Sequence, residues 1–234
     1  MRKTAVVTGG TKGIGRAIIE KLSRHGFDII TCARNQADLD QIKSEIESKY
    51  KNHVEVVCAD LSLRSEVNTL VELICAKCDR LDILVNNTGI FLPGEITSEP
   101  EGNLELMINT NLYSAYHLTR GVIDLMMRQE FGDIFNICSI ASITAYPNGG
   151  SYSISKFAML GMSKVLREEL KPHGIRVVSI LPGATLTASW AGVDIPEDRF
   201  MKAEDVAEAV WSAHSMSRNS VVEEIVIRPQ LGDL

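Results

Sequence analysis

The stretch TAVVTGGTKGIGRAI, from Thr4 to Ile18, joins a short β-branched run, a glycine-rich turn and the start of an amphipathic pattern. It predicts a strand over residues 4–9 and a helix over 13–25. The glycines follow a G-x-x-x-G-x-G spacing. Glycine lets backbone amides turn sharply and approach a pyrophosphate, and the N-terminus of the following helix adds partial positive charge. A tight turn alone would also need glycine, but the position after the first strand favours a phosphate-binding loop formed by Gly9, Thr11, Lys12, Gly13, Ile14 and Gly15.

The rest of the chain alternates short apolar runs with amphipathic stretches in the same way. Most of the runs are β-branched and almost continuously apolar, which is typical of strands covered on both faces. Strand and helix alternation indicates a parallel sheet with right-handed crossovers. We therefore predict one α/β domain over residues 1–234, a Rossmann-type doubly wound sheet of about seven strands with helices on both faces. The further strands are expected at 27–33, 54–59, 81–87, 132–139, 175–182 and 222–229, and the further helices at 36–51, 64–79, 103–129, 151–172 and 203–214.

Composition narrows the class of protein. The 234 residues carry a formal net charge of -6 and only 6% aromatic residues, which argues against nucleic acid as a partner. No window approaches the apolar length of a membrane span, and the N-terminus lacks the features of a signal peptide, so we expect a cytoplasmic protein with no membrane partner. The C-x-x-C at Cys75 to Cys78 lacks a second pair and a nearby His, so we expect no metal.

Two cations lie where the adenosine end of a dinucleotide would be. An enzyme that prefers NAD typically has a carboxylate after the second strand, but Ala33 and Arg34 stand there, followed by Asn35. Lys12 adds a second positive charge from the glycine loop. Both cations could be solvated surface residues, yet together they suit a 2′-phosphate, so we expect NADP(H).

Polar residues also follow the third and fourth strands, whose carboxyl ends should reach the same crevice. Asp60, followed by Leu61, could accept a hydrogen bond from an adenine amine. Asn87, Thr88 and Gly89 suit backbone positioning around a ribose, although turn chemistry alone would also favour these residues.

Tyr152 and Lys156 are four residues apart in a predicted helix, so their side chains should lie on one face, one turn apart. Ser139 ends the fifth strand, thirteen residues before Tyr152, and Asn111 lies inside the long predicted helix. Each of these residues has an ordinary structural explanation on its own. Together they predict a site for proton transfer.

The motifs TGGTKGIG, NNTG, YSISK and LPG, with Asn111 and Ser139, resemble those of the short-chain dehydrogenase/reductase family over nearly the whole chain. The resemblance implies a nicotinamide cofactor and a catalytic tetrad of Asn111, Ser139, Tyr152 and Lys156. Tyr152 and Lys156 are also expected to contact the cofactor. Thr88 and Leu181 depart from the more usual Ala and Asn of the family. The cofactor contacts that the resemblance adds are Pro182, Gly183, Thr185 and Thr187.

The expected chemistry is the reduction of a carbonyl. Tyr152 would give its proton to the carbonyl oxygen as hydride arrives, and Ser139 would hold that oxygen. We expect Lys156 and the positive nicotinamide to lower the pKa of Tyr152 from its usual value of about 10. Asn111 would support a water that connects Lys156 to solvent. The segment 184–202 is expected to form a substrate lid, with Phe91, Tyr146 and Trp190 as pocket walls.

The C-terminal part of the chain is most similar to a bacterial sepiapterin reductase subgroup, which implies a pterin side-chain dicarbonyl as substrate. A pterin needs a carboxylate for its guanidine-like edge, and Asp194, Glu197, Asp198 and Asp233 are available. Reduction of 3-oxoacyl carriers or oxidation of short hydroxy acids uses the same catalytic set. A non-catalytic NADP(H) sensor is the alternative of another class. The family also implies a homodimer or homotetramer built on the helices that contain Asn111 and Tyr152.

Overall fold

Seven parallel strands form one sheet in the computed structural model, which describes residues 2–187, 192 and 194–233. Their order is β3-β2-β1-β4-β5-β6-β7, so the chain builds one half outward from β1 and then returns to build the other half from β4. The point of reversal lies between β1 and β4, where doubly wound sheets bind their ligands. The Rossmann-type fold predicted from sequence is confirmed. The strands are β1 (Lys3–Thr8), β2 (Phe27–Ala33), β3 (Val54–Cys58), β4 (Ile83–Asn86), β5 (Gly132–Ile137), β6 (Ile175–Pro182) and β7 (Glu224–Ile227).

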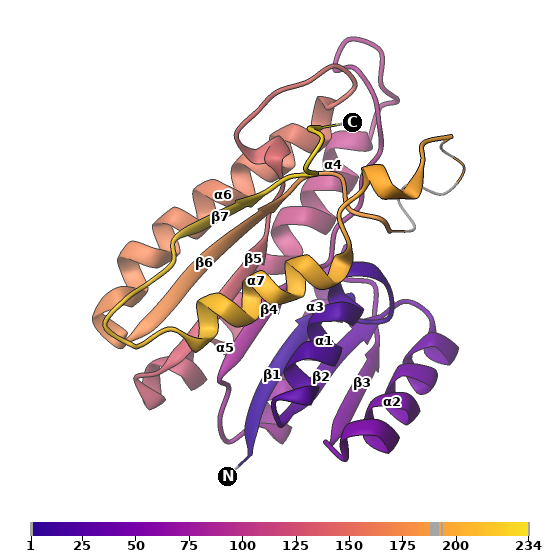
Figure 1. Cartoon of the computed structure of the whole chain (residues 1–234). Helices are drawn as coiled ribbons and strands as arrows, with labels where there is room; N and C mark the ends of the chain where they lie inside the picture. Colours follow the sequence, from indigo (N-terminus) through magenta and orange to yellow (C-terminus); the bar gives the residue numbers. More distant parts are fainter. Residues whose placement is uncertain (1, 188–191, 193, 234) are drawn as a thin grey trace.

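Helices cover both faces of the sheet (Figure 1). Successive strand residues point to opposite faces, so Ala5 and Val7 pack with α1, α2 and α7, whereas Val6 packs with α3 and α5. Both layers are made of fully buried aliphatic side chains, as expected for a parallel sheet. The α-helices are α1 (Gly13–Arg24), α2 (Gln36–Tyr50), α3 (Arg64–Lys77), α4 (Asn103–Ile108), α5 (Ser114–Gln129), α6 (Gly150–Leu170) and α7 (Ala203–Ser215).

The long helix predicted over residues 103–129 is interrupted. A π-helical turn, η1 (Asn109–Tyr113), separates α4 from α5, and the Ser114 amide bonds back to the carbonyl of Asn109, five residues earlier. Such turns insert one residue into a helix and are frequent at functional sites. The apolar pattern continues through the turn, so hydrophobic periodicity alone does not detect it.

Short 3-10 turns complete the architecture: η2 (Ile140–Ser142), η3 (Lys171–His173) and η5 (Glu197–Arg199). The last strand is shorter than predicted from sequence, at Glu224–Ile227 rather than 222–229. In the part of the chain that the structure describes, no helix combines the length and apolarity needed to cross a bilayer.

Candidate active site

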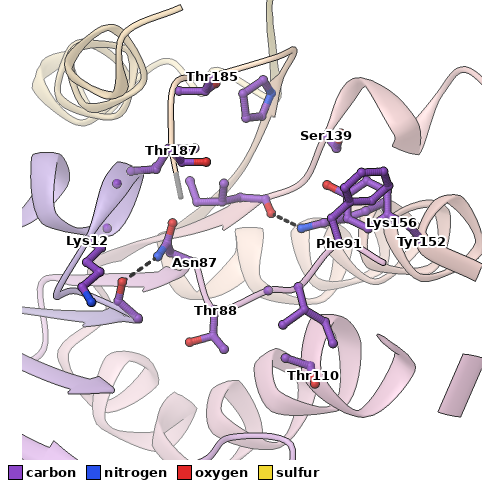
Figure 2. A pocket seen from close by; sticks show the side chains of 18 of the residues that line it. Lys12, Asn87, Thr88, Phe91, Thr110, Ser139, Tyr152, Lys156, Thr185 and Thr187 are labelled. Carbon is purple, nitrogen blue, oxygen red and sulfur yellow. Dashed lines mark hydrogen bonds between the residues drawn. The ribbon is translucent and has the colours of Figure 1, made fainter. Parts of the chain in front are cut away.

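A cleft of about 1000 Å³ lies at the carboxyl ends of the strands. Nearly all of the site residues predicted from sequence line it. Asn111 lies behind its wall instead, and Trp190 falls outside the described residues. The cleft reaches from Lys12 at one end to Ser139, Tyr152 and Lys156 at the other (Figure 2). The lining residues that were predicted are Gly9, Thr11, Lys12, Gly13, Ile14, Gly15, Arg34, Asn35, Asp60, Leu61, Asn87, Thr88, Gly89, Phe91, Ser139, Tyr146, Tyr152, Lys156, Pro182, Gly183, Thr185 and Thr187.

The glycine loop has the geometry of a phosphate cradle. Gly9 has a φ of +64°, and a Cβ on Gly15 would come within 2.3 Å of the Gly9 carbonyl oxygen. Helix α1 begins at Gly13, and the side chain of its N-cap residue, Lys12, bonds no amide of the first turn. The loop therefore offers uncapped backbone N–H groups at a positive helix end, which fits the pyrophosphate of a dinucleotide.

Thr8, which the sequence did not single out, organises the floor of this cradle. Its hydroxyl oxygen accepts hydrogen bonds from the amides of Asn87 and Thr88, both at 2.9 Å. The side-chain amide of Asn87 in turn donates to the carbonyl of Thr8 at 2.8 Å and to that of Gly9 at 3.2 Å. The loop after β1 and the loop after β4 are thereby joined across the point where the strand order reverses.

The adenosine end of the cleft carries an acidic residue as well as the two predicted cations. Arg34 is exposed, whereas the Nζ of Lys12 lies 2.7 Å from the Oδ2 of Asp38. Asn35 caps α2, because its Oδ1 accepts the Asp38 amide at 3.1 Å. Asp60 accepts the Ser62 amide at 3.0 Å in the loop before α3. Asp38 is a lining residue that sequence reasoning missed, because it reads as an ordinary first-turn acid of a helix.

Tyr152 lies in the first turn of α6, with its ring edge against Phe91 at a centroid distance of 4.9 Å. Burial raises the pKa of its phenol above the usual value, and a hydrogen bond with Ser139 acts in the opposite direction. The expected lowering of this pKa by Lys156 and the positive nicotinamide together stays a prediction for the cofactor complex, because in the protein alone the net shift is upward. The reason is that the low-dielectric surroundings penalise the phenolate more than the hydrogen bond stabilises it.

Lys156 lies one turn further along α6 and is 4% exposed. Its Nζ is 5.8 Å from the centre of the Tyr152 ring and donates to the Ile137 carbonyl at 2.9 Å, as Figure 2 shows. Burial lowers the pKa of this ammonium, and neighbouring Cys138 raises it. Gly89 lies beside this ammonium, because a Cβ on Gly89 would be 3.5 Å from the Nζ of Lys156, in van der Waals contact.

Ser139 follows β5 and starts the 3-10 turn η2. Its Oγ accepts the Ala141 amide at 3.1 Å, while the Ser142 hydroxyl accepts the Ser139 amide at 3.2 Å. This reciprocal cap fixes the Ser139 side chain. Because a backbone N–H already donates to its oxygen, the Ser139 hydroxyl directs its own proton toward Tyr152 in the cleft.

Asn111 is fully buried and binds the chain that follows β4. Its Oδ1 accepts the Ile90 amide at 2.7 Å, and its Nδ2 donates to the Ile90 carbonyl at 3.0 Å and to the Ser155 hydroxyl at 2.9 Å. Both protons of the side-chain amide are thus used within the protein. The side chain connects η1 to α6 and to the loop that carries Gly89.

The wall beyond Tyr152 is formed by Phe91 and Tyr146 as predicted, and by Asp233 from the C-terminal segment. Burial raises the pKa of Tyr146 to about 12, with a further contribution from Tyr152. Asp233 pairs with Arg228 at 2.8 Å. The other carboxylates considered for a pterin, Asp194, Glu197 and Asp198, do not line the cleft as far as the structure describes it.

The chain matches the short chain dehydrogenase family model over residues 3–197. It is 33% identical to the sepiapterin reductase of Chlorobaculum tepidum, with 100% of this chain and 99% of that protein covered.

Solved structures agree with this match. An alcohol dehydrogenase from Thermococcus sibiricus, complexed with 5-hydroxy-NADP, superposes with a TM-score of 0.92 at 25% identity, covering 99% of this chain and 98% of the other. L-sorbose reductase from Gluconobacter frateurii, complexed with NADPH and L-sorbose, superposes with a TM-score of 0.90 at 26% identity, covering 97% and 95%. The extent of these matches, together with the cleft at the carboxyl ends of a doubly wound sheet, shows that the chain belongs to the short-chain dehydrogenase family.

Proposed function

We propose that the protein is an NADPH-dependent oxidoreductase that reduces a small-molecule carbonyl to an alcohol, with sepiapterin or a related diketone as substrate. The observation that carries the proposal is the grouping of Ser139, Tyr152 and Lys156 at one end of a cleft that has the glycine loop at its other end. The solved relatives named above are complexed with 5-hydroxy-NADP and with NADPH, and the Chlorobaculum relative is a sepiapterin reductase.

Bound NADPH would supply a hydride to the carbonyl carbon. Ser139, whose hydroxyl bonds to Tyr152 in this structure, would donate its proton to the carbonyl oxygen when substrate is bound, and its fixed position makes that interaction favourable as negative charge develops. Tyr152 keeps its proton near neutral pH because burial raises its pKa, so it would be ready to protonate the same oxygen. Lys156, whose Nζ is held by the Ile137 carbonyl, would stabilise the phenolate that remains.

Asp233 supports a pterin among the possible substrates. It is the carboxylate, of the four considered, that lines the cleft, and a guanidine-like edge could form charge-assisted hydrogen bonds with it in competition with Arg228. The aromatic rings of Phe91, which is half-buried, and Tyr146, which is exposed, line the cleft and would pack against a flat bicyclic ring.

The direct test is a screen of NADPH consumption with sepiapterin, simple diketones, 3-oxoacyl thioesters and short oxo acids, on the parent protein and two variants. Tyr152→Phe should lower kcat by about 100-fold or more, because the proton donor is lost. Tyr50→Phe is the matched control: its hydroxyl is buried, has no hydrogen-bond partner among the described residues, and lies outside the cleft.

An unchanged rate in Tyr152→Phe would contradict the proposed chemistry. If only the 3-oxoacyl thioesters or only the short oxo acids are reduced, that class of compound would be the substrate in place of sepiapterin and the diketones. Tight NADPH binding with no turnover of any compound would favour the non-catalytic sensor.

We also propose that the protein forms a homodimer or homotetramer through η1, α5 and α6, where Tyr113, Tyr116, Phe157 and Val165 are exposed. Light scattering should give a mass of two or four chains, and Phe157→Glu should reduce it. Val221→Glu, at an exposed apolar residue outside these helices, should not change the mass. A parent protein that runs as a monomer at micromolar concentration would contradict the proposal.

The organisation as one cofactor-binding domain with a substrate lid at 184–202 remains a proposal. The two ends of that segment are joined, because the Leu186 amide bonds to the Met201 carbonyl and the Met201 amide bonds to the Ala184 carbonyl, both at 2.9 Å. Residues 188–191 and 193, which include the predicted pocket residue Trp190, lie outside the described residues.

A further inference from the structure

The adenosine end of the cleft contains a carboxylate, whose negative charge would repel the phosphate of the proposed cofactor. Lys12 from the glycine loop, Arg34 after β2 and Asp38 in the first turn of α2 all line it. The Nζ of Lys12 lies 2.7 Å from the Oδ2 of Asp38, and the side chain of Lys12 is 68% exposed. The pair is therefore a surface contact that can open, at the point where a cofactor phosphate has to be recognised.

Asp38 is the fixed partner in this pair. Its amide donates to the Oδ1 of Asn35, the N-cap of α2, and its carboxylate lies near the positive end of the helix dipole. Arg34, by contrast, makes no ion pair and no side-chain hydrogen bond with the described residues. Of the two cations, one is thus free and the other is neutralised by an anchored carboxylate.

We propose that Asp38 is a specificity-determining residue that competes with the 2′-phosphate of the cofactor for Lys12. This inference rests on the proposed NADP(H) site. A carboxylate beside a dianionic phosphate weakens its binding, whereas it leaves the uncharged 2′-hydroxyl of NADH unopposed. Asp38 therefore makes the preference for NADPH over NADH smaller than Lys12 and Arg34 alone would make it.

The test measures binding, so that it does not depend on turnover. Calorimetry compares adenosine 2′,5′-bisphosphate with 5′-AMP, which lacks only the 2′-phosphate. Asp38→Asn should bind the bisphosphate about three- to tenfold more tightly and 5′-AMP with affinity unchanged within about twofold. The gain should shrink as salt is raised. Asp40→Asn is the matched control, because Asp40 is an exposed carboxylate of the same helix that does not line the cleft.

A second variant, Lys12→Ala, tests the same contact from a residue outside α2, so the result does not depend on the stability of that helix. In the parent, where Asp38 already pairs with Lys12, Lys12→Ala should weaken bisphosphate binding only slightly. In the Asp38→Asn background, the loss of bisphosphate affinity caused by Lys12→Ala should be several times larger. Equal effects of Lys12→Ala in the two backgrounds, or unchanged or weaker bisphosphate binding in Asp38→Asn, would overturn the proposal. So would a parent that fails to bind the bisphosphate.

The same variants separate this proposal from the proposed function. If the carbonyl reductase assignment is wrong, NADPH oxidation is absent while the effect of Asp38→Asn on bisphosphate binding persists. If the role of Asp38 is wrong, the enzyme turns over but its ratio of kcat/KM for NADPH and NADH is the same in Asp38→Asn and the parent.

Discussion

Burial has opposite effects on the two titratable side chains of the candidate site. It raises the pKa of Tyr152 and lowers that of Lys156, so each group is shifted toward its neutral form. A neutral phenol is the form that can donate a proton to a carbonyl oxygen. A hydrogen bond from Ser139 limits the pKa shift of Tyr152, and neighbouring Cys138 limits that of Lys156.

A prediction at this scale concerns Asp233. Asp233→Asn should raise KM for sepiapterin by about tenfold, because a charge-assisted hydrogen bond to the guanidine-like edge is lost. KM for a small diketone without that edge should stay within about twofold. Steady-state kinetics with both substrates measure the two KM values. Asp198→Asn, which changes a carboxylate that does not line the cleft, is the control. Equal KM changes for the two substrates would mean that Asp233 supports the cleft without contacting a pterin.

At the scale of elements, the site depends on how η1 and α6 are held together. Asn111 bonds to Ile90 and to Ser155 of α6, and Glu99 accepts hydrogen bonds from Ser151 at the start of α6. These contacts orient the helix that carries Tyr152 and Lys156. The π-helical turn places Asn111 inward even though the flanking helices keep their apolar faces on the sheet.

Asn111→Ala should therefore destabilise the protein by about 2–3 kcal/mol, because three hydrogen bonds are lost and the partly buried backbone N–H and C=O of Ile90 lose their partner. For a chain of this size that corresponds to a Tm about 4–12 °C lower. Asn109→Ala is the control in the same turn, at a residue that is only half-buried. Thermal unfolding of the two variants measures the difference, and equal Tm values would show that the Asn111 bonds contribute no net stability.

On the scale of the whole molecule, a buried ion cluster lies near the starts of the strands, at the end of the sheet opposite the cleft. Asp133 of β5 receives two bonds from Arg176 of β6, at 2.7 and 2.8 Å, and further bonds from His214 of α7 at 2.6 Å and Arg218 at 2.7 Å. Burial by itself would raise the pKa of Asp133, but these partners hold it at about 2. The cluster joins the neighbouring strands β5 and β6 to the last helix, α7.

Because the folded pKa of Asp133 is below its unfolded value of about 3.9, its carboxylate stabilises the fold above that pH. This contribution, on the order of 2–3 kcal/mol, is lost as pH falls toward 2. Asp133→Asn should lower the free energy of unfolding at pH 7 by about 3–5 kcal/mol, because the buried Arg176 and the more exposed Arg218 lose their counter-charge. Urea denaturation at pH 7, 4, 3 and 2 should show the gap to the parent narrowing between pH 4 and 2. Asp124→Asn, at an exposed residue of α5, should show no such gap. A pH-independent gap for Asp133→Asn would contradict the assignment.

The sequence by itself determined the order of strands and helices, the fold class and most of the residues that line the cleft. The reason is that these depend on local periodicity, on glycine at a turn, and on the rule that the carboxyl ends of parallel strands meet at one edge. Only the tertiary structure decided which groups touch. The pairing of Lys12 with Asp38, the links from Thr8 to the loop after β4, the interruption at Asn111 and the direction of the Tyr152 pKa shift arise from contacts or burial that no local pattern specifies.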